Sequence, residues 1–193
     1  MTKLHFSLFL TVFLFACGQH ETPKPRGYFR IDLPEKGYTE FNSGFPYRFH
    51  YPLYAEFVPD NRIWAEPFWG DLVFDGLNAR IHLSYKEVED INNLYGYLED
   101  AYTFVNKHIP KATAIHEESF VYENKKVFGM LFHIKGREAA SPLQFYATDS
   151  TDHFLRGALY FATTPNNDSL APVIRFIEED VKHLLSTLEW VEN

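Results

Sequence analysis

The hydrophobic pattern of this chain changes its period twice, and this change constrains the fold more than any other feature. Apolar and polar residues alternate over residues 79–86, which predicts a strand with one buried face. From Val88 to Ile109 the apolar residues instead follow at steps of three and four, which predicts a helix that ends before Pro110. The expected buried stripe of this helix is Val88, Ile91, Tyr95, Leu98, Tyr102, Val105 and Ile109.

The alternating pattern returns after Pro110 in a series of runs that are joined by short links. These runs are residues 113–122, 126–135, 143–148 and 153–163. Short links favour antiparallel pairing of neighbouring strands, so we expect a four-stranded meander. Asp168 or Ser169 is then expected to cap a last helix. The buried stripe of that helix comprises Val173, Ile177, Val181, Leu184 and Leu188.

The part of the chain before residue 79 carries weaker signals. Residues 28–33 and 47–51 are typical of short strands, and a proline follows each of them. Residues 54–58 and 62–68 fit either further strands or an irregular stretch whose aromatic side chains enter the core. The whole order predicts an α+β domain: a mostly antiparallel sheet with a mid-chain helix and a C-terminal helix packed on it. It resembles the PsbP-like fold, an analogy that assigns no activity.

The amino-terminal residues have the pattern of a lipoprotein leader. The apolar run over residues 6–16 would rise about 16 Å as a helix, too little for a transmembrane anchor. It ends in Leu14, Phe15, Ala16 and Cys17, which look like a bacterial lipobox with the single cysteine of the chain as the lipidated residue. We expect a signal peptide over 1–16 that is removed, a lipidated, proline-containing tether over 17–27 and one globular domain over 28–193. The alternative is a plain secretory signal with an incidental cysteine.

Charge and cysteine content exclude several classes of protein. The chain has 18 basic and 26 acidic side chains, a formal net charge of −8, and no basic run. A nucleic-acid-binding protein needs a concentrated positive surface, so that class is excluded. One cysteine allows neither an intrachain disulfide nor a paired-cysteine zinc or redox motif. An aromatic content of 18% speaks against disorder.

Catalytic and metal-binding motifs are weak. No two of the nine histidines are three or four residues apart, so no helix face offers a metal pair, and we expect no metal and no cofactor. Asp149, Ser150, Thr151, Asp152 and His153 supply the residue types of a hydrolase within five positions. A catalytic triad is defined by spatial roles, however, and these residues are equally typical of a hairpin turn. An envelope hydrolase that uses this turn is kept as an alternative, as is a loop that contacts a partner.

One set of polar and aromatic residues is expected to share a strand face. The set comprises Arg80, His82, Gln144, Tyr146, Arg156 and Tyr160, with Thr148 beside them. If their strands stack, these residue types match those enriched at protein interfaces. The set is therefore a possible partner surface. The alternatives are a solvated face, a face covered by the amino-terminal segment, or a ligand pocket.

Several segments carry a resemblance to a known family. Residues 23–30 read PKPRGYFR shortly after the lipobox, and residues 45–55 and 82–86 read FPYRFHYPLYA and HLSYK. The longest similar block covers residues 144–170. With these segments the chain resembles the GldD family, the gliding-motility lipoproteins of Bacteroidetes. This resemblance implies a cell-envelope component that gliding and the associated type IX secretion machinery require. It supplies no catalytic residues.

The residues and the resemblance favour an assembly or interaction protein without catalysis. Its expected partners are the membrane, through acyl chains on Cys17, and other proteins of the gliding and secretion machinery. No nucleic acid and no small-molecule substrate are expected. The alternatives are the hydrolase above and a periplasmic binder of a small ligand or glycan. The anchored chain is expected to face the periplasm, because no dense acidic stretch of the kind associated with surface export follows Cys17. The choice between inner and outer membrane stays open.

Overall fold

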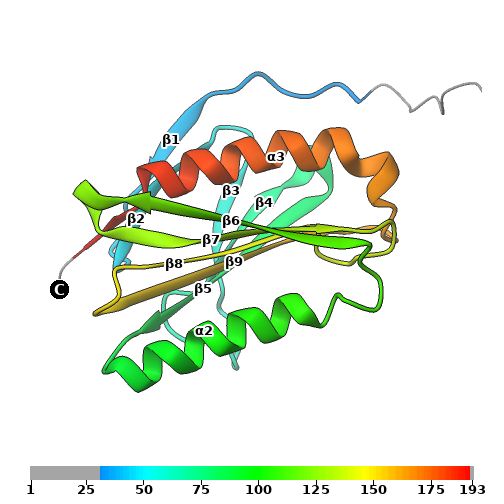
Figure 1. The fold of residues 1–193 in the computed structure, drawn as a ribbon. Coiled ribbons are helices and arrows are strands. Elements are labelled where there is room, and N and C mark those ends of the chain that lie inside the picture. Colours follow the sequence, from blue (N-terminus) through cyan, green and yellow to red (C-terminus); the bar gives the residue numbers. More distant parts are fainter. Residues whose placement is uncertain (1–30, 192–193) are drawn as a thin grey trace, which may run out of the picture. The chain divides into compact units, whose positions relative to one another are not determined.

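The computed structural model describes residues 31–191, in which a seven-stranded sheet has the order β3-β4-β5-β9-β8-β7-β6 (Figure 1). Its strands are β3 (Glu56–Pro59), β4 (Gly70–Phe74), β5 (Ala79–Glu87), β6 (Ala114–Tyr122), β7 (Val127–Lys135), β8 (Leu143–Thr148) and β9 (His153–Phe161). A smaller sheet, in the order β1-β2-β10, contains β1 (Tyr38–Phe41), β2 (Tyr47–Pro52) and β10 (Glu189–Trp190). All paired neighbours run antiparallel.

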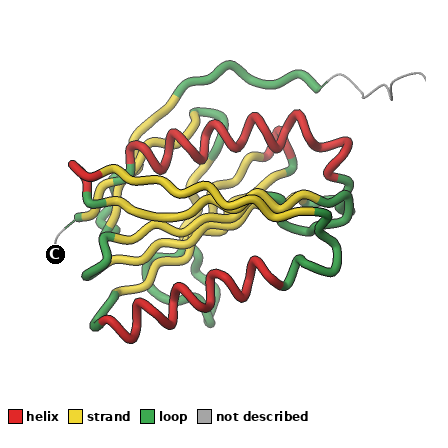
Figure 2. The backbone as a smooth tube through the Cα atoms, viewed as in Figure 1, coloured by secondary structure: helices red, strands yellow, loops and turns green. Residues whose placement is uncertain are grey.

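The helices α2 (Ile91–Asn106) and α3 (Asn167–Thr187) lie on opposite faces of the seven-stranded sheet (Figures 1 and 2). Two short 3₁₀ turns, η2 (Asp75–Leu77) and η3 (Glu123–Lys125), connect β4 to β5 and β6 to β7. The predicted α+β class is confirmed, with its mid-chain helix and its C-terminal helix packed on a mostly antiparallel sheet. The predicted meander is the run of neighbours from β6 to β9.

The main core lies between the large sheet and the layer formed by α3 and the small sheet. On β5 the residues Ile81, Leu83 and Tyr85 are buried, and the residues between them are more exposed, which is the predicted alternation. The stripe predicted on the last helix is buried against this face: Val173, Ile177, Val181, Leu184 and Leu188. The cap of α3 is Asn166, two or three residues before the predicted Asp168 or Ser169.

Helix α2 packs on the other face of the sheet, with a stripe that matches the predicted one only in part: Val88 and Val105 are buried and Leu98 and Tyr102 pack on the core. Asp90 caps it, since its carboxylate accepts hydrogen bonds from the backbone N–H groups of Asn92 at 2.7 Å and Asn93 at 2.9 Å. The residues of α2 that are buried are Leu94, Ala101 and Val105. The predicted stripe members Ile91, Tyr95 and Ile109 are 54%, 64% and 58% exposed, so that part of the prediction is wrong. A helix buries only about a third of its circumference, and the sheet contacts the side of α2 next to these residues.

The irregular region before β5 differs most from expectation. Residues 31–33 form no strand, and neither do residues 62–68. Trp64 is 68% exposed and Phe68 is 38% exposed, so these aromatic side chains do not enter the core as predicted. The strands β1, β4 and β10 were not expected. The predicted signal peptide, the lipobox cysteine Cys17 and the tether over 17–27 lie outside the described residues.

Candidate functional site

The residues predicted to form a partner surface share one face of the large sheet, because β9 lies between β5 and β8. They are Arg80 and His82 on β5, Gln144 and Tyr146 on β8, and Arg156 and Tyr160 on β9. Arg80 lies opposite Tyr160, and Tyr146 lies opposite Arg156. Residues that face each other in an antiparallel pair project to the same side of the sheet. This side is the one on which α2 packs.

Helix α2 divides this face into a covered part and an open part. Tyr146 stacks on Phe154 at 5.7 Å between ring centroids and lies 6.5 Å from the ring of Tyr102 on α2. Gln144 is only 1% exposed, so its place on an accessible partner surface is corrected: it lies in the floor of the face. The side chains that remain accessible are those of β5 and β9.

A pocket of about 520 Å³ lies on the β5 side of α2. Five parts of the chain enclose it: the segment between β3 and β4, the strands β4, β5 and β9, and α2. His82, Arg156 and Tyr160 from the predicted surface line it. The aromatic side chains in its wall are Trp69, Tyr97, Phe104, Phe154 and Tyr160. Both the volume and the mixed apolar and charged lining are typical of small-molecule sites.

Ion pairs hold the acidic side of the pocket. The Arg62 guanidinium donates hydrogen bonds to the Asp60 carboxylate, with 2.8 Å from Nε to Oδ1, and these bonds lower the pKa of Asp60 to about 2. The Asp71 carboxylate pairs with Arg80 at 3.1 Å and with the Nδ1 atom of His82 at 2.5 Å. The Asp71 pairs link β4 to β5 along one side of the pocket, and the Asp60–Arg62 pair lies within the segment before β4.

Arg156 forms the opposite side of the pocket and is held differently. Its Nη2 atom donates a hydrogen bond of 2.5 Å to the side-chain oxygen of Gln144, and its guanidinium lies 4.5 Å from the ring centroid of Phe104 on α2. Burial lowers the pKa of Arg156, and the neighbouring Tyr160 opposes that effect only in part. No carboxylate among residues 31–191 forms an ion pair with it. Arg156 is thus a partly buried cation that faces a pocket without an acidic partner.

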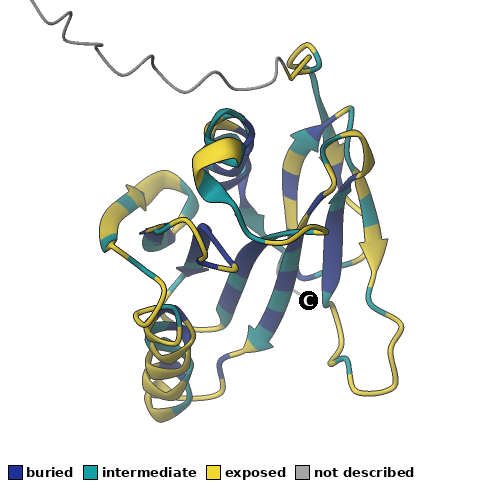
Figure 3. Cartoon of the chain, turned by 90° about the vertical axis from the view of Figure 1, so that its right-hand side faces the viewer, coloured by how far each residue is buried: buried dark blue, intermediate teal, exposed yellow. Residues whose placement is uncertain are grey.

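A second hollow, of about 300 Å³, lies on the other side of α2. Leu94 and Leu98 of α2 line it together with Val121 of β6 and Phe128 of β7. Ile91, Tyr95 and Tyr102 share one side of α2 by their spacing of four and seven residues. The Tyr102 hydroxyl donates to Glu117 of β6 at 3.3 Å, so this side of the helix faces β6. We use the name α2–β6 groove for this hollow together with the exposed side chains beside it, which are Ile91, Tyr95 and Val121. The outward surface of α2, the lower helix in Figure 3, is largely exposed.

The turn that carries the residue types of a hydrolase does not assemble them as a triad. The Asp149 carboxylate accepts hydrogen bonds from the backbone N–H groups of Thr151, Asp152 and His153 at 2.9 to 3.0 Å, which is the geometry of a turn. The His153 ring is engaged elsewhere, with Nδ1 2.8 Å from the Tyr85 hydroxyl and its plane stacked on Trp190. Asp149 therefore supports the backbone and is not bonded to the His153 imidazole.

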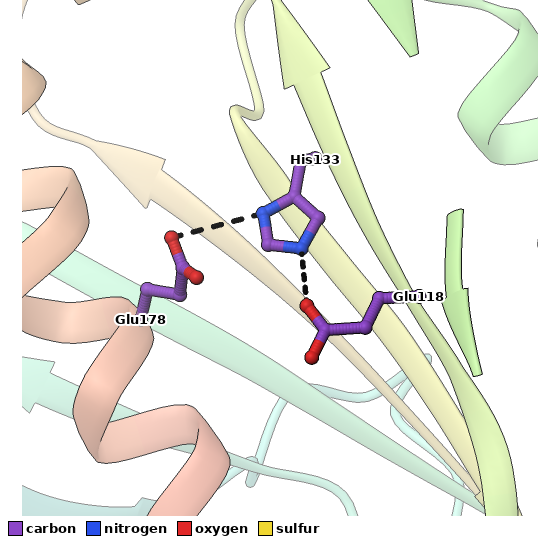
Figure 4. A group of neighbouring side chains, drawn as sticks. All are labelled: Glu118, His133 and Glu178. Carbon is purple, nitrogen blue, oxygen red and sulfur yellow. Dashed lines mark hydrogen bonds and ion pairs between the residues drawn. The ribbon is translucent and has the colours of Figure 1, made fainter. Parts of the chain in front are cut away.

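Glu118, His133 and Glu178 form a cluster that sequence reasoning missed (Figure 4). The His133 ring lies between the two carboxylates, 3.1 Å from Glu118 and 3.7 Å from Glu178. Lys182 already supplies a cation to both carboxylates, at 3.0 and 3.2 Å. The arrangement is therefore an ion-pair network that joins β6 and β7 to α3. The three residues are 15 or more positions apart in the sequence, so no spacing motif could reveal them.

A known protein family accounts for nearly the whole chain. The family model described as gliding motility lipoprotein GldD matches residues 18–190. The chain belongs to this family. The predicted resemblance to GldD is thereby confirmed, and the protein is a gliding motility lipoprotein. No curated protein sequence matches it.

Among solved structures, the solution structure of cyanobacterial PsbP (CyanoP) from Synechocystis sp. PCC 6803 is similar to this GldD family member. The TM-score is 0.47 and the sequence identity is 11%, over 82% of this chain and 95% of that chain.

A lipoprotein is attached to a membrane through its acyl chains. Neither α2 nor α3 is both long and apolar enough to cross a bilayer. The family description names no reaction. Family membership therefore supports one part of the predicted localisation, namely membrane attachment in the cell envelope.

Most pocket residues of this GldD family member escaped the sequence analysis. Asp71 lies on β4, a strand of five residues whose apolar pattern is too short to recognise. Asp60, Arg62 and Trp69 come from the segment between β3 and β4, which has no period at all. One local signal existed: aspartate and arginine two residues apart, as at Asp60 and Arg62, can pair within a turn.

Proposed function

We propose that this protein is a lipid-anchored assembly protein of the gliding machinery and of the associated type IX secretion machinery. Acyl chains on Cys17 would hold it at a membrane, facing the periplasm, and the folded part would contact other proteins of the machinery. Family membership supports the place in gliding motility. The turn geometry at Asp149, in which the carboxylate bonds to backbone groups, supports a role without catalysis.

The observation that carries the interaction role is the α2–β6 groove. Ile91 and Tyr95 on α2 and Val121 on β6 are 54%, 64% and 59% exposed, beside a hollow that is lined by further apolar side chains. Large apolar residues gathered beside a concave surface are typical of protein–protein contacts, which aromatic anchors dominate. The groove lies on two regular elements, so its shape is fixed before a partner binds. The partner we expect is a protein with an apolar helix or segment.

The polar face of β5 and β9 takes a smaller part in this proposal than the sequence suggested. Arg80 remains exposed at the outer end of the face, and His82 and Tyr160 are half-buried. Their side chains are engaged in the pocket described above, which is too narrow for a folded partner. Contacts at Arg80 would therefore add to docking at the groove and would not replace it.

A paired exchange at the groove tests the proposal. The double variant Ile91→Ser, Tyr95→Ser should keep the melting temperature and the membrane attachment of the protein, since both side chains are largely exposed. Removing one central aromatic anchor typically weakens an interface by about tenfold or more, so gliding, secretion and co-purification of partners should all fall. Mass spectrometry of proteins captured from solubilised membranes measures the last effect.

The control exchanges a still more exposed isoleucine away from the groove. Ile63 is 96% exposed, and Ile63→Ser should leave gliding and captured partners unchanged. Normal gliding by cells that carry the Ile91 and Tyr95 double variant would overturn the groove as the docking site. Equal loss with Ile63→Ser would show that exposed apolar residues act without regard to position.

A further inference from the structure

Arg156 differs from the other basic side chains that line the pocket between α2 and β5. Arg62 pairs with Asp60, His82 with Asp71, and Lys86 with Glu66. Within the described part of the chain no carboxylate pairs with Arg156, although it is half-buried. Taking a charge out of water is costly unless an opposite charge compensates it. The pocket therefore favours a ligand that brings an anionic group to this position.

The guanidinium of Arg156 is held in a fixed orientation toward such a group. Gln144, buried in the sheet floor, accepts one hydrogen bond from Nη2 at 2.5 Å, and the Phe104 ring lies 4.5 Å from the guanidinium carbon. A guanidinium has five N–H donors in a rigid fork that matches a carboxylate. Gln144 and Phe104 therefore act as positioning residues that leave donors of Arg156 available to the pocket.

The remaining wall of the pocket suits a ring that carries hydroxyl groups. The Nζ atom of Lys86 lies over the rings of both Trp69 and Tyr97, 5.6 and 5.8 Å from their centroids, which leaves the other face of each ring for a ligand. Such flat apolar faces stack against the C–H face of a sugar ring or against an aromatic ring. Asp100 of α2 also lines the pocket and makes no hydrogen bond or ion pair with residues 31–191, so its carboxylate can accept hydrogen bonds from hydroxyl groups.

We propose that this pocket binds a carboxylated sugar, with the carboxylate on Arg156, the ring against Trp69 and Tyr97, and ring hydroxyls on Asp100. A volume of about 520 Å³ accommodates a ligand of one or two sugar rings. An aromatic acid would use Arg156 and the ring faces and leave Asp100 without a donor. A neutral sugar would leave Arg156 without its anion. The pocket lies on the opposite side of α2 from the groove, so this site does not depend on the docking proposed above.

Calorimetric titration of the full mature chain in detergent micelles tests the ligand class. D-glucuronate is the probe, D-glucose is the neutral comparison, and benzoate is the aromatic acid. Glucuronate should bind at least about tenfold more tightly than either, because charge-assisted hydrogen bonds are the strongest in such a site. Equal or weaker binding of glucuronate relative to glucose overturns the proposal. Tighter binding of benzoate assigns the pocket to aromatic acids and overturns the sugar.

Variants then test the residues. Arg156→Gln should weaken glucuronate binding at least about tenfold, and Arg156→Lys should weaken it less, since an ammonium keeps the charge without the fork. The control Arg48→Gln removes an exposed arginine that pairs with Glu189 outside the pocket, and it should bind as the unaltered chain does. Unchanged affinity in Arg156→Gln overturns the assignment of the carboxylate.

A second pair keeps the test decisive if Arg156→Gln does not fold, which circular dichroism would reveal. Tyr97→Phe retains the ring and loses only a hydroxyl that donates to the Glu87 carbonyl at 3.3 Å, so it should weaken glucuronate binding less than a variant that loses the ring. Tyr97→Leu removes the flat face and should weaken binding several-fold. Equal affinity in these two variants would overturn stacking against Tyr97.

Discussion

The most consequential single residue in the described fold is Asp180, an aspartate on α3 that is 2% exposed. Its carboxylate accepts hydrogen bonds from Lys36 at 2.5 Å, Tyr38 at 3.1 Å and Tyr54 at 2.6 Å. These three donors come from the segment before β1, from β1 itself and from the link between β2 and β3. One buried charge thus ties the small sheet and its connections to α3. A buried charge is tolerated when it is paired in this way.

Removing that charge should destabilise the protein strongly. Asp180→Asn keeps the shape of the side chain but leaves Lys36 without its closest anion, and we expect the free energy of unfolding to fall by about 3 kcal/mol. Glu179 is the matched control, because it also approaches Lys36, at 3.7 Å, but is 71% exposed. Glu179→Gln should change stability by less than about 1 kcal/mol. Urea denaturation measures both, and equal losses would contradict the role of Asp180.

His183, one turn beyond Asp180, should make stability depend on pH. Burial and the nearby His50 lower the pKa of His183, while Asp180 opposes them in part. Its ring stacks on Tyr38 at 3.7 Å, and its Nε2 atom has no hydrogen-bond partner among the described residues. The unfolded chain, in which the ordinary pKa is 6.5, therefore binds the proton more readily than the folded protein does.

The sign follows from that difference. The stabilising effect of neutral His183 is complete above the unfolded pKa and is lost as the pH falls below it. The urea midpoint should be lower at about pH 5.5 than at about pH 7.5, and this difference should be smaller in His183→Gln. His116, an exposed histidine of β6, provides the control, since His116→Gln should keep the full loss. A midpoint that depends on pH equally in all three proteins would contradict the assignment to His183.

At the scale of single elements, two glycines illustrate how the same substitution can act in opposite directions. Gly96 lies inside α2, and a Cβ atom there would meet nothing within 4 Å. Gly129 lies on β7, where a Cβ atom would approach the backbone oxygen of Tyr146 on β8 to 2.0 Å. Gly96→Ala should raise the free energy of unfolding by about 1 kcal/mol through helix propensity. Gly129→Ala should lower it by about 2 kcal/mol, because a strand must shift. Chemical denaturation measures the free energy of unfolding of both variants, and changes of the same sign would contradict the packing of β7 on β8.

The elements that the sequence predicts correctly are those with a long hydrophobic period. Strand β5 alternates over its whole length, and α3 buries the stripe expected from a period of 3.6. The strands that escaped prediction have two to five residues, β10 being only Glu189–Trp190, and their pairing depends on partners far away in the chain. For α2 the period is correct and the direction only partly so: Val105 is buried, whereas Ile91 and Tyr95 are exposed, since the pattern does not say which half of the apolar side meets the sheet.

At the scale of the whole molecule, the candidate site arises from an order of strands that the sequence does not contain. Short links predict β9 beside β8, but only the fold places β5 on the other side of β9. That arrangement brings His82 and Arg156 to one pocket, in agreement with the shared face that the alternation on each strand predicts. It also buries Gln144, because α2 covers the part of the face at β8. Which half of a polar face stays open depends on where a helix packs, and no local pattern records that.

The whole molecule also provides the last prediction, which concerns attachment to the membrane. The sequence predicts acyl chains on Cys17, each buried methylene adding about 0.8 kcal/mol, and more than one chain is needed for durable anchoring. Cys17→Ser should abolish incorporation of a labelled fatty acid and move the protein out of the detergent phase during phase separation. Gliding should be lost while circular dichroism of the purified variant stays unchanged, because the described fold begins at residue 31. Gln19→Ala, a substitution in the tether two residues from Cys17, is the control. Retention of Cys17→Ser in the detergent phase, without labelled lipid, would show that another contact holds the protein at the membrane, and the exposed α2–β6 groove would then be the first surface to test.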